Sequence, residues 1–262
     1  MIEEKKKLEL MHEEPRYHKN VLYIRPEEQD VLKKVKIVFG GVGLGSVLAE
    51  SLLRLGFENF VFIDGDTVDA SNLNRQNYTE AQVGSSKVAA ISERLKSINT
   101  NVNIEFHNVF LEPDTVKQYL KGSDIAINAI DFDVMDTPFV FDQVCKELGI
   151  PVIHPLNFGW AAGAFLVTPD SDQIFQVEEQ EDRFEFVLIE KMLAYLEKRN
   201  DIELSWFYQI IEDYKAVSNQ ISPPQLVVGS NLAAALTANI VFSWVTKLPV
   251  KTYPEPYFIS TR

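Results

Sequence analysis

The chain has 262 residues, of which 46% are hydrophobic, and a formal net charge of −13 at pH 7. Its length allows one large domain with a sizeable core, and its acidity argues against a broad surface for nucleic acids or anionic membranes. The single cysteine, Cys145, excludes an internal disulfide framework and leaves no CxxC pair for zinc.

Short apolar strands alternate with helices through the first two thirds of the chain. After an N-terminal helical arm (1–34), whose charged start lacks the apolar stretch of a signal peptide, strands are predicted at 35–39, 60–64, 103–107, 125–129 and 151–154. Helices are predicted at 46–55, 85–98, 114–120 and 137–148. This alternation predicts a Rossmann-like α/β fold, with a mainly parallel sheet and helices on both faces. We expect a cytoplasmic protein.

The composition changes after Pro169. An acidic run at 178–182 precedes two amphipathic helices, 187–198 and 204–215. They form a helical insertion (170–224) in a single domain whose core is 35–168. A last unit (225–262) contains the apolar run 232–245 and an extended piece near 257–259. The run falls short of the roughly 20 residues that a membrane span needs, so we interpret it as a buried helix.

A glycine-rich turn follows the first predicted strand. Gly40, Gly43 and Gly45 give the spacing GxxGxG, with Val42 in place of the second glycine of GxGxxG. Backbone N–H groups and the positive end of a helix at such a turn suit phosphate. A tight turn that only packs a helix against a sheet is the alternative.

The stretch from Asp64 to Gln76 is the most informative part of the chain. Asp64 ends the second strand, where an acid suits a ribose, and Asp66 directs a second carboxylate the same way if the chain stays extended. Alternatively one of the two, more readily Asp66, only turns the backbone. Asn72 and Arg75 are spaced one helical turn apart, so both can face one ligand, and the forked donors of Arg75 suit phosphate.

Two later positions extend this pattern. Lys87 stands at a helix start and can reach a phosphate, although alone it would be an ordinary surface lysine. Asp131 lies just past the fourth strand, at the edge where α/β sheets bind ligands, and a lone carboxylate near phosphates suits Mg²⁺. Asp133 and Asp136 compete for that role. Together these residues predict a nucleoside triphosphate site rather than an ordinary dinucleotide site.

In this order, the motifs resemble those of the ubiquitin-activating-enzyme-like superfamily, the ThiF/MoeB/HesA adenylyltransferases. The resemblance covers about 35–155 and comprises GxxGxG, Asp-x-Asp-x-Val, Ser-Asn-Leu-Asn-Arg-Gln, Val-Gly-x-x-Lys and Asp131. It implies ATP- and Mg²⁺-dependent adenylation of a carboxylate with release of pyrophosphate. The usual acceptor is the C-terminal glycine of a ubiquitin-like or sulfur-carrier protein, but a peptide or a small acid also presents a carboxylate, and the sequence does not separate these acceptors.

The resemblance also implies residue roles. Asp64 would hold the ribose, Asn72, Arg75 and Lys87 the phosphates, and Asp131 the Mg²⁺, with Arg75, Lys87 and Asp131 as the catalytic set. The nucleotide-binding set would be Gly40, Gly43, Gly45, Asp64, Asp66, Asn72, Arg75, Lys87 and Lys19. Family members commonly form homodimers, in which Lys19, with Arg16 beside it, would reach the triphosphate of the partner.

The chain departs from the family pattern at several points. Phe132 and Asp136 stand where the family commonly has Asn and Arg, and the CxxC pairs are missing, so no structural zinc is expected. Cys145 falls in a predicted helix rather than in the catalytic-cysteine region, and we interpret it as a packed thiol, which disfavours a thioester mechanism. His154 either lines the acceptor side or packs structurally.

Three alternatives stay open. An enzyme related to tRNA threonylcarbamoyladenosine dehydratase shares the motifs, although the acidic charge makes nucleic acid an unlikely partner. A non-catalytic nucleotide-binding subunit would account for Val42, Phe132 and Asp136. An NAD dehydrogenase explains the glycine turn and Asp64 but leaves Asn72, Arg75 and Lys87 unexplained. In the preferred interpretation, an adenylyltransferase, the helical insertion determines the choice of acceptor and no membrane is involved.

Overall fold

The computed structural model describes residues 14–130, 137–172, 174, 184–199, 202–218 and 220–262. In chain order the elements are η1 (Pro15–Asn20), α2 (Pro26–Leu32), β1 (Lys36–Gly40), α3 (Gly43–Leu55), β2 (Asn59–Ile63), η2 (Ala70–Asn72), η3 (Glu80–Gln82), α4 (Lys87–Ile98), β3 (Asn103–His107), α5 (Val116–Leu120), β4 (Ile125–Asn128), α6 (Thr137–Leu148), β5 (Val152–Asn157), β6 (Ala161–Val167), α7 (Phe184–Leu196), α8 (Ser205–Val217), α9 (Val227–Val245) and β7 (Tyr257–Ser260).

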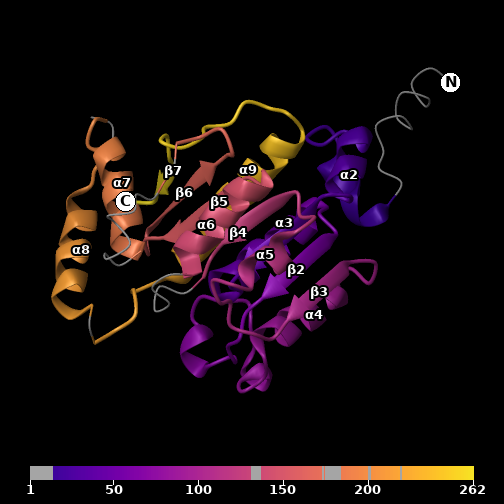
Figure 1. Ribbon diagram of the computed structural model, residues 1–262, viewed down its shortest axis with the longest axis horizontal. Helices are drawn as coiled ribbons and strands as arrows, with labels where there is room; N and C mark the ends of the chain where they lie inside the picture. The colour runs from indigo at the N-terminus through magenta and orange to yellow at the C-terminus, as the bar shows by residue number, and fades with distance from the viewer. Residues whose placement is uncertain (1–13, 131–136, 173, 175–183, 200–201, 219) are drawn as a thin grey trace.

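A seven-stranded sheet in the order β3-β2-β1-β4-β5-β6-β7 runs through the protein (Figure 1). Strands β1 to β5 pair in parallel, whereas β6 and β7 add an antiparallel edge. The mainly parallel sheet predicted from the sequence is thus confirmed. The strand order reverses at β1, with β2 on one side and β4 on the other, and the carboxyl ends of strands at such a switch point are where α/β folds bind ligands.

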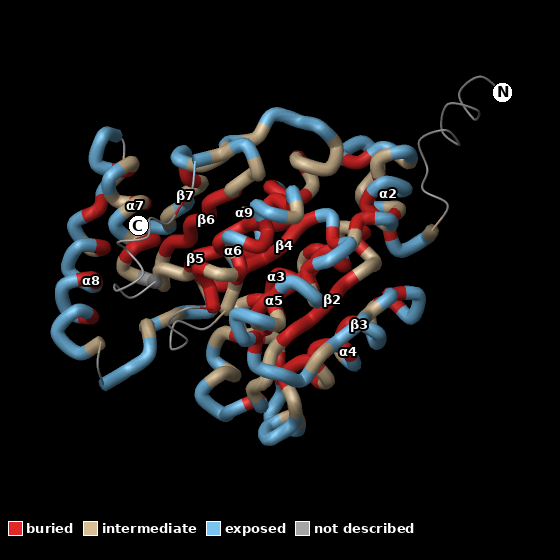
Figure 2. The backbone as a smooth tube through the Cα atoms, viewed as in Figure 1, coloured by how far each residue is buried: buried red, intermediate tan, exposed pale blue. Residues whose placement is uncertain are grey.

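Alternate residues of the central strands bury opposite faces of the sheet. In β1, Ile37 and Phe39 belong to a core with α3, α4 and α9, whereas Val38 belongs to a second core with α5 and α6. Strand β2 repeats the pattern with Phe60 and Val61. Because side chains alternate across a strand, a continuous apolar run fills both cores. Figure 2 shows the resulting layer of buried strands under helices whose outer faces are exposed.

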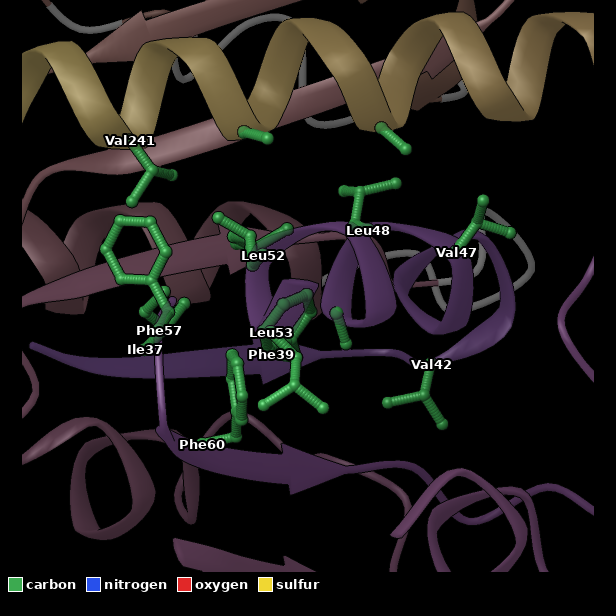
Figure 3. Packing of buried hydrophobic residues seen from close by; sticks show 14 of the residues in the cluster. Ile37, Phe39, Val42, Val47, Leu48, Leu52, Leu53, Phe57, Phe60 and Val241 are labelled. Carbon is green, nitrogen blue, oxygen red and sulfur yellow. The ribbon is translucent and has the colours of Figure 1, made fainter. Parts of the chain in front are cut away.

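Helix α9 forms an inner layer with α3. Among the residues that the structure describes, α9 is the one helix whose length and composition would also suit a membrane span. Here it packs against α3, β5 and β6, with small residues such as Ala233 and Ala234 buried at the contact. Figure 3 shows α9 lying along α3, with Val241 of α9 above Phe57, the second residue after α3. The interpretation of this segment as a packed helix is confirmed.

Helices α7 and α8 stand beyond β6 and β7 at one end of the molecule (Figure 1). They share a third core that includes Met192, Phe207 and Phe165. The absence of a side chain at Gly163 in β6 makes room for α7, since a Cβ there would lie 2.6 Å from Met192 Cε. The two amphipathic helices predicted after Pro169 are confirmed. Their apolar faces extend the core toward the carboxyl end of β5.

Candidate functional site

The glycine turn between β1 and α3 is shaped by close backbone contacts. Gly41 has φ +89°, and a Cβ there would fall 2.1 Å from Ala129 O, so only glycine fits. Gly40 and Gly45 make room for packing, because their Cβ atoms would lie 2.9 Å from Phe141 and 3.2 Å from Phe39. Gly43 starts α3, and a Cβ there would lie 3.1 Å from Gln76 Nε2. Of the three predicted glycines, Gly43 is the one that lines the two cavities described below.

Val42 is held from two sides. Its N–H donates to Asp64 Oδ2 at 2.8 Å, and its carbonyl accepts a hydrogen bond of 2.8 Å from the Tyr78 hydroxyl. The Val42 side chain is fully buried and points into the core beneath α3 (Figure 3). Since it is directed away from the turn's open side, the valine in the second-glycine position does not block a ligand there.

Asp64 organises the backbone at the end of β2. Its Oδ2 accepts from Val42, and its Oδ1 accepts the N–H of Asp66 at 2.8 Å. Burial raises the pKa of Asp64, and the nearby Lys87 ammonium opposes this rise. The sequence favoured Asp66 as the acid that turns the backbone. The structure shows the reverse, because Asp64 accepts both N–H groups.

Asp66 instead forms an ion pair. Lys87 Nζ lies 2.7 Å from Asp66 Oδ2, and the lysine side chain is 5% exposed. Two backbone bonds, from Val68 N to Ser85 O and from Gly84 N to Val68 O, each 2.8 Å, bring the two segments together. Lys87 is therefore not an ordinary surface lysine. Its charge is held next to a carboxylate at the carboxyl edge of the sheet.

Asn72 and Arg75 have different surroundings. Asn72 Oδ1 accepts the N–H of Asp69 at 2.9 Å and so caps its own turn. Arg75 Nε donates to Gln225 Oε1 at 2.8 Å, and its Nη1 donates to Ser71 O at 3.0 Å. The spacing of the two residues in the sequence did not indicate that Asn72 caps a turn while Arg75 contacts Gln225. Gln225, 150 residues away in sequence, was not predicted and has no motif that could have identified it.

A cavity of about 200 Å³ opens beside the glycine turn. Its walls include Gly41, Gly43, Asp64, Asp66 and Phe110. We call it the nucleotide cavity, after the role that we propose for it below. Phe110 follows β3 and is 64% exposed, and an exposed aromatic ring offers a face on which a base stacks. Phe110 was not predicted as a cavity residue from the sequence, although it follows a parallel strand at the edge where α/β sheets bind ligands.

A larger cavity of about 280 Å³ adjoins the first. The two share Gly43, Ala129 and Ile130, which lie at the turn after β1 and the end of β4. The larger cavity, called the acceptor cavity below, also has Arg75 on its wall and extends to α7 and α8. The two cavities thus meet at the N-terminus of α3, where backbone N–H groups favour an anion.

The remaining buried polar residues lie beneath this site. His154 is fully buried, with Nε2 2.8 Å from Asp142 Oδ2, and Asn128 Nδ2 donates to Asp142 Oδ1 at 2.9 Å. Of the two roles considered for His154, the structure supports the packed one. Cys145 is also fully buried, and burial raises the pKa of its thiol, which confirms the interpretation as a packed thiol.

Within one chain, the fold does not place Lys19 close to the other predicted site residues. Its helix, η1, is fixed near the start of β2, where the Tyr17 hydroxyl donates to Glu58 Oε1 at 2.8 Å and Asn20 Nδ2 donates to Leu55 O at 3.2 Å. The cavities lie at the opposite ends of the strands. Action of Lys19 on a partner subunit stays a prediction.

The expected magnesium ligand, Asp131, lies outside the described residues, as do Phe132 and Asp136. Within the described ranges there is no cluster of three or more His, Cys, Asp or Glu side chains suited to a metal ion. The assignment of Mg²⁺ to Asp131 therefore stays a prediction.

Sequence comparison places adenylyltransferases among the relatives of this chain. The chain is 32% identical over 162 residues to the sulfur carrier protein ThiS adenylyltransferase of Bacillus subtilis, covering 60% of this chain and 48% of the relative. It is 30% identical over 151 residues to the molybdopterin-synthase adenylyltransferase of Haemophilus influenzae, covering 56% and 61%. The matches span about half the length of these relatives.

Solved structures share the whole fold. A structure of E. coli MccB with succinimide superposes with a TM-score of 0.71 at 21% identity, covering 95% of this chain and 68% of that one. PaaA gives a TM-score of 0.64 at 20% identity, covering 92% and 74%. The sequence profile of the ThiF family matches residues 17–254. The chain belongs to the ThiF family.

Proposed function

We propose that this protein is an ATP-dependent adenylyltransferase that activates the carboxylate at the end of a protein or peptide chain and releases pyrophosphate. The observation that carries the proposal is the meeting of two cavities at Gly43. One cavity is bordered by the acids and the aromatic ring that suit a nucleoside. The other leads toward α7 and α8 and gives a second substrate access to the same point.

The residues present fit ATP. The carboxylate of Asp64 uses one lone pair of each oxygen for a backbone N–H, and each oxygen has a second lone pair for a ribose hydroxyl. Phe110 offers a stacking face, and Gly43 presents the N-terminus of α3 to a phosphate. Arg75 supplies positive charge on the wall of the larger cavity, and Lys87 supplies positive charge beside Asp66, which lines the smaller cavity. Mg²⁺, when bound by Asp131, would neutralise phosphate charge.

The chemistry needs no covalent nucleophile from the protein. A carboxylate oxygen of the acceptor attacks the α-phosphorus of ATP, a new P–O bond forms, and the bond to pyrophosphate breaks. Negative charge develops on the α-phosphate oxygens and on the departing pyrophosphate. Groups that are already fixed near this charge provide the catalysis, and removing one such donor typically slows a reaction by about 10²–10³.

Two relatives support this proposal through what they are named for, the adenylation of sulfur-carrier or molybdopterin-synthase proteins. Structures of MccB with ATP and with MccA share the fold. A dehydrogenase would use Asp64 equally well, but it gives no role to the ion pair between the buried Lys87 and the half-buried Asp66, or to Arg75. The geometry therefore favours a triphosphate over NAD.

Thermal unfolding with ATP–Mg²⁺, ATP–EDTA and NAD tests the proposed binding of ATP, which is the nucleotide half of the proposal. A ligand at 100 times its dissociation constant stabilises the folded state by about 2.7 kcal/mol, or roughly 5–10 °C for a chain of this size. We expect this shift with ATP–Mg²⁺, a smaller one in Lys87→Met, and an unchanged one in the control Lys117→Met, whose lysine is exposed. A shift with NAD alone would contradict the proposal.

A further inference from the structure

The acceptor cavity has two chemically different ends. Near the nucleotide cavity its wall carries the polar groups of Gly43, Arg75, Gln76 and Asn128. At the far end its wall is built by apolar and aromatic side chains of α7 and α8. These are Leu188, Ile189, Phe207, Ile210, Ile211 and Tyr214. A molecule that fills the cavity therefore meets charge at one end and hydrocarbon at the other.

The loop between α8 and α9 closes the apolar end. Pro223, Pro224 and Leu226 line the cavity from this side. Two hydrogen bonds fix this loop to the rest of the site. Leu226 O accepts from Asn157 Nδ2, at the end of β5, at 2.9 Å, and Gln225 Oε1 accepts from Arg75 Nε at 2.8 Å. The apolar wall is thus held at a fixed place relative to Arg75, before any acceptor is bound.

Several of these apolar side chains are incompletely covered. Ile210 is 41% exposed and Leu226 is 37% exposed, although both face a cavity rather than a flat surface. An apolar side chain that enters would remove this surface from water, which is favourable. A chain end made only of glycines has no side chain to place there. Its carboxylate would reach the junction at Gly43 while the apolar end stayed unfilled.

We propose that the acceptor carries a large apolar side chain, of the size of Leu, Met or Phe, next to its reacting carboxylate, and that Ile210 and Leu226 help to select it. This inference rests on the proposed adenylation of a carboxylate, and it specifies the class of acceptor that carries this carboxylate. It separates this protein from enzymes that act on a Gly-Gly tail. Burying one Leu-sized side chain corresponds to a preference of about 10–100-fold over glycine in kcat/KM.

The test measures ATP-dependent pyrophosphate release with two mixtures of synthetic hexapeptides. Both are randomised at the first four positions, and they end in Phe-Leu or in Gly-Gly. We compare the wild type with Ile210→Gln and with the control Val217→Gln. Both positions lie in α8 and are similarly exposed, at 41% and 36%, but Ile210 lines the acceptor cavity whereas Val217 lies outside its wall.

We expect release with the Phe-Leu mixture to exceed that with Gly-Gly by about 10–100-fold in the wild type. Ile210→Gln should lose most of this preference, whereas Val217→Gln should keep it, with the same thermal shift by ATP in all three proteins. Equal or better release with Gly-Gly overturns the inference but supports adenylation. Release with neither mixture also overturns it, and the ATP shift in the same samples then shows whether the nucleotide half fails too.

Discussion

Replacing Asp64 with alanine removes the acceptor of two backbone hydrogen bonds at the centre of the site. The N–H groups of Val42 and Asp66 each lie 2.8 Å from an Asp64 oxygen. Leaving a buried donor without an acceptor costs about 1–3 kcal/mol. The ionised carboxylate is itself disfavoured by burial, as its raised pKa shows, and relief of that penalty offsets part of the loss. We therefore expect a net destabilisation of about 2 kcal/mol.

For a chain of this length, that change lowers the unfolding midpoint by roughly 4–8 °C. The matched control is Asp124→Ala. Asp124 Oδ2 also accepts one backbone N–H, from Lys36 at 2.8 Å, but the group is exposed and lies at the opposite end of β1. We expect the control to lose at most half as much stability and to keep its stabilisation by ATP–Mg²⁺. Equal losses in the two variants, or full ATP stabilisation of Asp64→Ala, would refute the reasoning about Asp64.

Four further predictions follow from the same geometry. Lys87→Met should weaken ATP binding by about 10-fold or more in a calorimetric titration, because a positive charge held at the site is lost; unchanged affinity would exclude Lys87 from the phosphate site. Gly41→Ala should destabilise far more than Gly149→Ala on chemical denaturation, since both have positive φ but only Gly41 has a backbone oxygen where the Cβ would be. Cys145→Ser should leave pyrophosphate release within about twofold of the wild type at a temperature where it is folded, and loss of turnover in the folded variant would argue for a thiol in the chemistry. The pKa of Asp64 in the folded protein lies above its ordinary value of 3.8. The free energy of unfolding of the wild type, relative to that of Asp64→Asn, should therefore be greatest below pH 3.8 and should decline as the pH rises through the folded pKa. A relative free energy of unfolding that increases over this pH range would contradict the raised pKa.

The sequence was informative where local patterns decide the structure. The run from Phe60 to Ile63 specifies a buried strand by composition alone, and the spacing of Leu188, Met192 and Tyr195 specifies a helix with one buried face. The antiparallel edge strands β6 and β7 were less visible, because their pairing joins segments about 100 residues apart. No local periodicity encodes such a contact.

The candidate site divides in the same way. Asp64 and Gly43 were predicted to lie together from their places after parallel strands, where backbone direction fixes the side of the sheet, and both line one cavity. The hydrogen-bond partners of the site residues could not be predicted, because the roles of Asp64 and Asp66 depend on which backbone N–H groups approach their carboxylates. The contact between Arg75 and Gln225 depends on how the chain returns after α8, which follows from tertiary packing.

The most direct test of the account is a crystal structure with a non-hydrolysable ATP analogue. We expect a base near Phe110, a ribose hydrogen-bonded to Asp64, and an α-phosphate at Gly43 where the two cavities meet, with the phosphate facing the acceptor cavity. A nucleotide bound elsewhere, or one whose α-phosphate is turned away from that junction, would contradict this expectation.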